Sequence, residues 1–512
     1  MNELSQLWGE ATGEEKQREA GLRPRGHHYP VYVIQIAIQL IIESLTSLRG
    51  VEKTFEILAN WWEIANPDFT SIRQWGLRLG LYELNREKNY RTDWIFILDM
   101  TLELGQSKCL AILGITQQRF TQITQQENRA LQHQDVEVLA LEVLEKSPGT
   151  IILEKLKNLG QRVGTPLQII SDRGSDLNKG IELYLELNPG VISTYDITHK
   201  MAALLKKELS TDERYQNFLH QCSLTRHQTQ QTELYFLAPP KQRSKARYHN
   251  VDILVEWAIK VLRYQQKGDF DQISTAYSLD GETLFLLWDT PARDCLAQLL
   301  KLTPNVYENQ AVFTQALSTH LGEDVWQLHS EIICQSAALG RRKFQAKLGW
   351  LCTYQQEIET YTEIVNLVQT VEKQVKIQGL HCQSHLLWEA ATTTKALSQR
   401  GQKLKQQISD YLAKEASQVP ERQTLLGTSD IIESLFGKYK IFSAARPLKE
   451  IGTIILTIPL CTAKITSDFV KTALETIRYL DVQTWSQLVL GPSMLSKRST
   501  LQVAAAPGTE VA

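Results

Sequence analysis

The stretch TDWIFILD, residues 92–99, decides how the rest of this sequence is interpreted. Its apolar residues run unbroken from Trp94 to Leu98, and such a run predicts a β-strand that is buried on both faces. The run ends at Asp99. A turn residue is one explanation for that aspartate, but a half-buried carboxylate is costly without a nearby cation. Asp99 is therefore a candidate for binding a metal ion.

The same pattern recurs downstream. Residues 166–171 predict a short strand that ends at Asp172, and residues 191–195 predict a further strand that ends at Asp196. The apolar spacing also predicts a strand over residues 108–115 and helices over residues 136–144, 151–159 and 177–185. Strands and helices in this order predict an α/β fold, with a mixed sheet flanked by helices.

Two acids at strand ends gain a chemical meaning when a third carboxylate joins them. Glu433 is the candidate, because it lies in the apolar helical segment IIESLF, residues 431–436. Together, Asp99, Asp172 and Glu433 would form an all-oxygen site that suits Mg²⁺. Two such ions can activate a water or sugar hydroxyl and stabilise the leaving oxygen of a phosphodiester. No side-chain nucleophile is then required.

Two of these acids have rivals. Asp176 competes with Asp172, but its place after the strand predicts that it caps the following helix. Glu421 and Glu450 compete with Glu433, although neither lies in a comparable apolar helix.

The residues before the first strand predict two helices. Residues 46–62 and 70–79 are separated by a short turn, and the second helix opens with polar and basic residues. This order is typical of a helix-turn-helix, in which Arg73 and Gln74 would contact DNA. An all-helical packing module is the alternative interpretation.

From residue 201 to about residue 420 the sequence predicts helices only. Candidates for contact with DNA phosphates are the basic residues Arg243, Lys245, Arg247, Arg341 and Arg342, with Lys438 and Lys440 after Glu433. Solvated surface side chains are the alternative. Trp326 and Trp350 could stack on a base, but a tryptophan in a helical bundle more often belongs to the core.

Composition narrows the class of protein. The apolar fraction of 43% and charged fraction of 22% are those of a globular protein. A net charge of −2 gives no basic surplus, so contacts with nucleic acid must come from local patches. The seven cysteines form no Cys-x-x-Cys pair, which favours a reducing cytoplasm. We expect no membrane span and no secretory signal.

Three segments resemble the catalytic core of DDE (Asp-Asp-Glu) transposases of prokaryotic insertion sequences, which have an RNase H-like fold. WIFILD, ending at Asp99, resembles the first strand of that core, and IISDRGSD, containing Asp172, resembles the fourth. TSDIIESLFGKYK, residues 428–440, resembles the helix that carries the catalytic glutamate, here Glu433. Asp172 and Glu433 are 261 residues apart. This gap is similar to that of transposases whose core is split by a large insertion, such as hAT-type elements and the V(D)J recombinase.

The insertion-bearing families also carry a Cys/Asp-x-x-His pattern after the second aspartate. Asp196-Ile197-Thr198-His199 matches that pattern. The resemblance implies that a neutral His199 positions water or the scissile phosphate. The alternative is a helix N-cap followed by an incidental histidine.

The resemblance implies an enzyme that cleaves transposon ends and joins them to target DNA. It would use two Mg²⁺ ions, with Mn²⁺ as a substitute, and its partner would be double-stranded DNA. Pairing of two ends implies a homodimer or a higher synaptic oligomer, working at the nucleoid in the cytoplasm. The alternatives are a domesticated transposase-derived DNA-binding protein without catalysis and another RNase H-like nuclease, although such nucleases are usually compact.

The expected domains follow from these segments. Residues 1–90 would be the helical DNA-binding region, residues 91–210 the first part of the RNase H-like core, and residues 211–424 an all-α insertion. Residues 425–500 would complete the core, and residues 501–512 would form a disordered tail.

Overall fold

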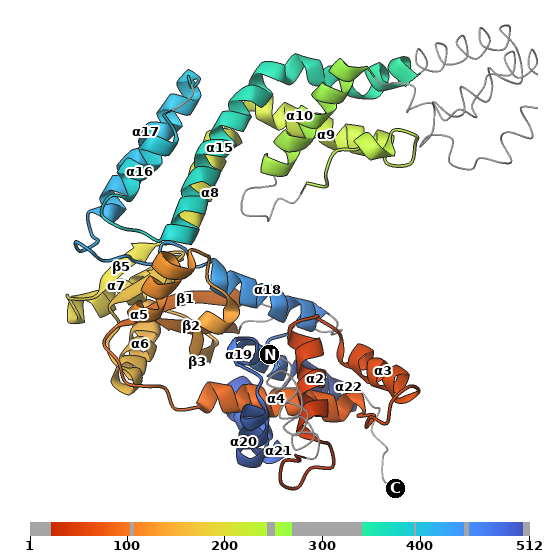
Figure 1. Cartoon of the computed structure of the whole chain (residues 1–512), viewed down its shortest axis with the longest axis vertical. Helices are drawn as coiled ribbons and strands as arrows, with labels where there is room; N and C mark the ends of the chain where they lie inside the picture. The colour runs from red at the N-terminus through yellow and green to blue at the C-terminus, as the bar shows by residue number, and fades with distance from the viewer. Residues whose placement is uncertain are drawn as a thin grey trace, which may run out of the picture. The chain divides into compact units, whose positions relative to one another are not determined.

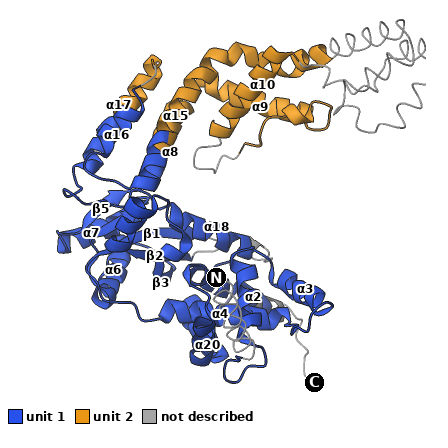
Figure 2. Cartoon of the chain, viewed as in Figure 1, with its two compact units in different colours: residues 1–200, 370–393, 409–512 blue, residues 201–369, 394–408 orange. Residues whose placement is uncertain are grey.

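A computed structural model describes residues 22–102, 107–242, 251–268, 340–393, 396–444 and 450–504. The chain has a mixed α/β architecture that divides into two compact units (Figure 2). Unit 1 comprises Met1–Lys200, Thr370–Thr393 and Ser409–Ala512, and unit 2 comprises Met201–Gln369 and Thr394–Ile408. Unit 1 contains the sheet, so three separate parts of the sequence build the predicted core.

A five-stranded sheet forms the centre of unit 1 (Figure 1). Its strands are β1 (Trp94–Leu102), β2 (Lys108–Thr116), β3 (Glu137–Leu144), β4 (Gln168–Ser171) and β5 (Ile192–Tyr195). The spatial order is β3-β2-β1-β4-β5. Strand β2 is antiparallel to both β1 and β3, whereas β4 is parallel to both β1 and β5. The predicted mixed sheet is confirmed, and it is compatible with an RNase H-like core.

The central strand β1 is buried on both faces, as its apolar run predicted. Trp94, Phe96 and Leu98 pack in the core formed with α6 (Gly149–Val163) and α7 (Ser175–Leu187). Ile95 and Ile97 pack in the opposite core. Because side chains alternate along a strand, the next residue of this second face is Asp99.

The helix predicted over residues 136–144 is wrong, because these residues form strand β3. Antiparallel pairing joins Ile112 to Ala140 but Leu113 to Val138, which leaves Leu139 as an extra residue in a β-bulge. The bulge interrupts the two-residue alternation. Adjacent apolar residues are then both buried, and their spacing imitates the apolar face of a helix.

The prediction that β1 ends at Asp99 is also wrong, because the strand continues to Leu102. β2 remains paired along this extension, from Asp99 opposite Ala111 to Leu102 opposite Lys108. The parallel neighbour β4 stops earlier, where Leu98 pairs with Ser171. Asp99 therefore lies in a strand but beyond its last partner in β4.

The second face of the sheet is covered by helices from both ends of the sequence. The N-terminal helices are α2 (Val31–Ile42), α3 (Leu48–Ala59) and α4 (Phe69–Asn85). The C-terminal elements are α18 (Asp430–Ala444), the 3-10 turn η6 (Thr453–Leu456), α19 (Thr457–Thr462), α20 (Ser467–Thr476), α21 (Tyr479–Leu490) and α22 (Met494–Ala504). Apolar residues of these elements, except α22, share one core with β1 and β2. Residues 22–90 are thus packed within unit 1 and do not form a compact unit of their own.

Helix α4 approaches the C-terminal elements very closely at Gly80. A Cβ atom at that position would lie 2.1 Å from the carbonyl oxygen of Leu456. We expect Gly80→Ala to lower the free energy of unfolding by about 2–3 kcal/mol, because backbone must move to relieve the overlap. Gly76→Ala, one turn earlier, is the control, since its Cβ would meet only side-chain atoms at 3.8 Å or more. Chemical denaturation of both variants tests this; equal stabilities would contradict the close packing.

The remaining described elements are helical, as predicted for residues 201 to 420. Unit 2 and its connections contain α8 (Ile197–Ser210), α9 (Glu213–Thr229), α10 (Val251–Lys267), the turn η5 (Gly349–Tyr354), α15 (Gln355–Gln378) and α17 (Gln399–Ala416). Helix α16 (Ser384–Ala391) and the short helix α5 (Gln117–Gln122) belong to unit 1. Helices α8, α15 and α17 each begin in one unit and end in the other.

The expected tail from residue 501 is partly helical. Helix α22 continues to Ala504, in keeping with the good helix formers Leu, Gln and Ala in this segment. Residues 505–512 lie outside the described part of the chain. Among the helices that the structure describes, each is too short or too polar to span a bilayer.

Candidate metal centre

Three aspartates occupy neighbouring positions across the sheet. Leu98 of β1 pairs with Ser171 of β4, which pairs in turn with Tyr195 of β5. The residues that follow these three are Asp99, Asp172 and Asp196. Parallel strands in register therefore bring three acids from distant parts of the sequence to one edge of the sheet.

The environment of Asp99 disfavours the charged form of its carboxyl. Burial, together with the negative charges of Asp172 and Glu433, raises the pKa of its carboxyl to about 7. A hydrogen bond from the backbone N–H of Met100 (2.6 Å) and the charge of His199 act in the opposite direction. Asp99 is thus within electrostatic reach of the other two predicted acids and of the predicted histidine.

Asp172 lies in a tight turn that directly follows β4. Its Oδ1 accepts a hydrogen bond from the backbone N–H of Gly174 (2.9 Å). Asp176, the rival of Asp172, is held elsewhere, because its Oδ2 accepts from Ser147 Oγ (2.7 Å) and from Lys108 Nζ (3.2 Å). Asp176 lies in the first turn of α7 without capping it, so its predicted role as the helix cap is wrong. Asp176 is thus held by Lys108 and Ser147, whereas Asp172 makes no ion pair among the described residues.

Glu433 reaches the site because the returning chain is pinned to the sheet. Gln168 of β4 donates through Nε2 to the carbonyl of Leu426 (2.6 Å) and accepts from the N–H of Leu426 (2.9 Å). The N–H of Ile197 donates to the carbonyl of Gly427 (2.9 Å). These contacts fix residues 425–429 beside β4 and β5. Helix α18 begins immediately afterwards and places Glu433 in its first turn.

Asp196 connects three elements at this edge. Its Oδ1 accepts hydrogen bonds from the backbone N–H groups of Thr198 (2.7 Å) and His199 (3.2 Å), and so caps helix α8. Its Oδ2 accepts from the backbone N–H (2.9 Å) and the hydroxyl of Ser429, just before α18. Asp196 has no exposed surface. The end of β5, the start of α8 and the start of α18 are therefore held by one buried carboxylate.

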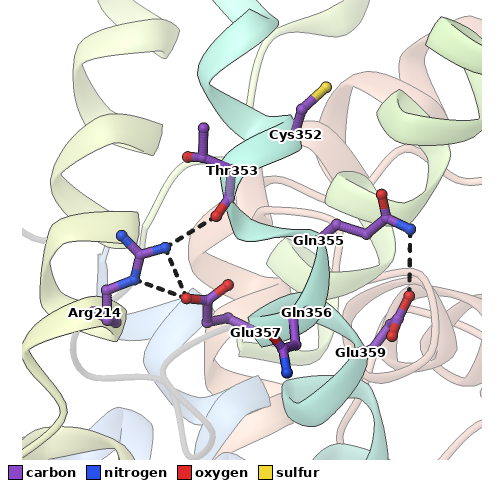
Figure 3. A pocket seen from close by; sticks show the side chains of 7 residues that line it. All are labelled: Arg214, Cys352, Thr353, Gln355, Gln356, Glu357 and Glu359. Carbon is purple, nitrogen blue, oxygen red and sulfur yellow. Dashed lines mark hydrogen bonds and ion pairs between the residues drawn. The ribbon is translucent and has the colours of Figure 1, made fainter.

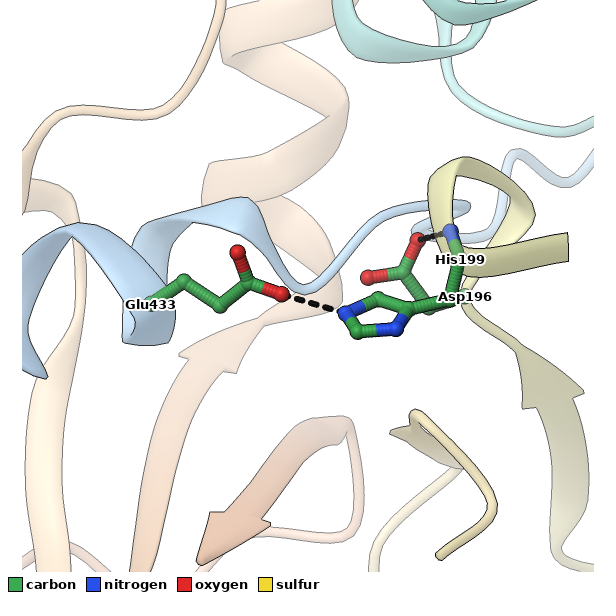
Figure 4. A group of neighbouring side chains, drawn as sticks. All are labelled: Asp196, His199 and Glu433. Atoms are coloured by element: carbon green, nitrogen blue, oxygen red, sulfur yellow. Dashed lines mark hydrogen bonds and ion pairs between the residues drawn. The ribbon is translucent and has the colours of Figure 1, made fainter. Parts of the chain in front are cut away.

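His199 and Glu433 point toward each other and form a hydrogen bond between Nε2 and Oε1 (Figure 4). One oxygen or nitrogen from each of Asp196, His199 and Glu433 lies within 4.8 Å of the others, a spacing that could hold a metal ion. We nevertheless exclude Asp196 as a metal ligand, because each of its two carboxylate oxygens already accepts two hydrogen bonds from buried or half-buried donors. His199 is then the immediate partner of Glu433, and Asp196 orients both residues.

The donor set at this edge fits Mg²⁺ or Mn²⁺. Asp99, Asp172 and Glu433 offer carboxylate oxygens, which these hard cations prefer. Burial is the main cause of the raised pKa of Asp99, and the charges of Asp172 and Glu433 add to it. The rivals of Glu433 are placed differently: Glu421 is exposed, and Glu450 accepts a hydrogen bond from the N–H of Met494.

The predicted DNA contacts are distributed over several elements. On α4, Arg73 donates to Thr453 Oγ1 (3.4 Å), and Oε1 of Gln74 is buried. The packing of α4 against α19 and α20 favours the alternative interpretation of this region as a packing module. A role for Arg73 and Gln74 in DNA binding stays a prediction.

The other basic candidates also remain predictions. Lys438 donates to the carbonyl of Ile42 (2.9 Å), whereas Lys440 is exposed on the same helix. Arg341 and Arg342 are exposed in unit 2. Arg243, Lys245 and Arg247 lie outside the described residues.

Unit 2 holds a polar pocket of about 430 Å³ (Figure 3). Its cation, Arg214, is engaged by Glu357 Oε1 (2.7 Å) and the carbonyl of Thr353 (2.9 Å). Trp350 belongs to the adjacent aromatic core, where its ring packs against Phe218 and its Nε1 donates to Thr225 (2.8 Å). Trp326 lies outside the described residues. We assign no chemistry to this pocket.

Two residues of the site were not predicted from the sequence. Gln168 anchors the returning chain, and Ser429 links it to Asp196. A glutamine inside an apolar strand was the available signal for Gln168, because a buried amide requires partners. Ser429 carried no comparable signal.

No family model and no curated protein matches this sequence. Among solved structures, the chain is similar to a chain of the "Drosophila P element transposase strand transfer complex". That match has a TM-score of 0.35 and 13% sequence identity, and it covers 91% of this chain and 100% of the other. A TM-score this low does not establish a common fold, so the function is inferred from the residues and their geometry.

Proposed function

We propose that this protein is a metal-dependent DNA transposase of the Asp-Asp-Glu type, with Asp99, Asp172 and Glu433 as the metal ligands. It would cleave the ends of a transposable element and join them to target DNA. The observation that carries the proposal is the environment of Asp99. Strand β1 holds the carboxyl of Asp99, whose pKa is raised to about 7 by burial and by the charges of Asp172 and Glu433. Glu433 lies 261 residues after Asp172 in the sequence.

The chemistry follows from what these residues can hold. Two divalent ions bound by the three acids would supply an activated hydroxyl and stabilise the departing oxygen of a phosphodiester. His199 keeps the Glu433 carboxylate oriented through its Nε2 contact and stands ready to contact water or phosphate. Asp196 holds the first turn of α8 and thereby the backbone of His199.

Cleavage assays test the proposal. Purified protein is incubated with Mg²⁺ and DNA that carries the element ends, followed by a strand-transfer assay with a target plasmid. We expect Asp99→Asn, Asp172→Asn and Glu433→Gln each to lower cleavage by on the order of a thousandfold or more, because each removes a charge from the metal site.

Asp176→Asn is the matched control, because Asp176 lies four residues after Asp172, in the first turn of α7, but pairs with Lys108. This variant should retain cleavage within a few-fold of wild type. Cleavage that survives the three acid substitutions would rule out the proposed metal centre. If the wild-type protein binds metal but cleaves no DNA, the alternative of a non-catalytic DNA-binding protein is favoured instead.

A further inference from the structure

A cluster of charged and aromatic side chains lies beside the turn that carries Asp172. The guanidinium carbon of Arg173 lies 5.3 Å from the centre of the Tyr195 ring in β5. Tyr411 and Glu415 are one turn apart on α17 and share a face of that helix. Glu415 accepts a hydrogen bond from the backbone N–H of Tyr195. The edge strand β5 therefore lies between Arg173 and the end of α17.

Glu415 is an unusual residue for an internal position. Glu415 is only 3% exposed. Its carboxylate accepts a hydrogen bond from β5, a strand at the edge of the sheet. Its second oxygen, Oε2, and the hydroxyl of Tyr411 are both buried, and neither has a hydrogen-bond partner among the described residues. A buried polar atom without a hydrogen-bond partner destabilises the fold, so its presence requires an explanation.

The positive charge of Arg173 acts on both of these side chains, as do those of Lys200 and Lys414 on Glu415. Burial raises the pKa of Glu415, and the positive charge of Arg173 offsets part of that rise. Burial and the charge of Glu415 raise the pKa of Tyr411, and Arg173 again acts in the opposite direction. Arg173 is therefore within electrostatic reach of both groups on α17.

The backbone of Arg173 is strained. Its φ of +53° lies in the left-handed region, which is sterically unfavourable for a residue with a Cβ atom. Such conformations persist where the surroundings impose them, often at functional sites. Here the turn lets Asp172 accept the N–H of Gly174 while Arg173 covers the Tyr195 ring.

We propose that Arg173 and Glu415 are positioning residues for Asp172. Arg173 lies over the ring of Tyr195, whose backbone N–H is held by Glu415, and so fixes the strained turn and aims the Asp172 carboxylate. The inference rests on the proposed function, because it takes Asp172 as a metal ligand. Helix α17 begins in unit 2 and ends in unit 1, so the returning helix of the insertion would contribute directly to the order of the metal centre.

Two measurements on the full chain test this role without an activity assay. Amide hydrogen exchange of residues 173–175 is measured in EDTA, and Mn²⁺ affinity is measured by electron paramagnetic resonance. We expect Arg173→Ala and Glu415→Gln to speed the exchange and to weaken Mn²⁺ binding by about tenfold, the effect typical of groups that orient a ligand. Arg173→Lys, which keeps the charge, should recover part of both.

Glu421→Gln is the control, because it makes the same chemical change at an exposed position nearby. It should leave exchange and affinity unchanged. Unchanged exchange in both Arg173→Ala and Glu415→Gln would overturn the positioning role, whatever the metal data show. If wild type binds Mn²⁺ no better than Asp172→Asn, the proposed function fails, and the exchange data still decide the role of Arg173 and Glu415.

Discussion

Asp99→Asn should stabilise the metal-free protein at pH 8 while abolishing cleavage. The folded pKa of Asp99, about 7, exceeds the ordinary value of 3.8, so the folded state binds the proton more tightly. Between these values the native chain carries more protons than the unfolded chain, and the stability of wild type falls as the pH rises. Asparagine has no charge to desolvate, so the variant escapes that loss.

The gain has a predictable size and pH dependence. The raised pKa corresponds to at most roughly 4 kcal/mol, and solvent screening at this half-buried site lowers the expected gain to about 1–3 kcal/mol. Denaturation in EDTA should show it fully above pH 7 and show none near pH 4. Saturating Mg²⁺ should reverse the order, because only wild type gains binding energy from the ion.

Asp93→Asn is a control of opposite sign. A hydrogen bond and ion pair with Arg91 hold the pKa of Asp93 below its usual value, so this substitution should leave stability unchanged or slightly lower. A gain of equal size in both variants would show that loss of any aspartate charge stabilises the fold. In that case Asp99 would not be distinguished by its setting.

The sequence predicted the centre of the sheet because burial there is complete. An unbroken apolar run fits a strand that is buried on both faces. The strand from Trp94 to Leu98 could therefore be predicted without knowing which face each residue occupies. The strand β3 failed for the opposite reason. The bulge at Leu139 is specified by pairing with β2, and pairing partners are not visible in a local pattern.

The third acid illustrates a second limit. Glu433 was assigned by resemblance, because no spacing rule covers a gap of 261 residues. Its proximity to Asp99 depends on hydrogen bonds between Gln168 and Leu426 and between Asp196 and Ser429. Each joins residues more than 200 positions apart. Such contacts form only in the folded protein. In the sequence, the only sign of them is a polar residue within an apolar segment.

The same contacts predict that loss of Asp196 should cost much stability. Asp196→Ala would leave four donors without acceptors: the N–H groups of Thr198, His199 and Ser429, and the Ser429 hydroxyl. Stranding buried polar groups in this way should lower the free energy of unfolding by about 3–5 kcal/mol. Asp68→Ala, which removes a comparable cap from an exposed helix start, should cost only about 1 kcal/mol.

Asp196→Asn separates the two halves of the network. Asparagine still accepts at the start of α8, where it is a good capping residue, but its amide group would face the donors of Ser429. Hydrogen exchange should therefore accelerate at residues 429–433 and stay slow at residues 197–200. Mn²⁺ affinity should fall with it, because α18 carries Glu433. Equal acceleration in both segments would show that Asp196 acts as a general packing residue, whereas the selective pattern would show that one buried carboxylate sets the position of the third metal ligand.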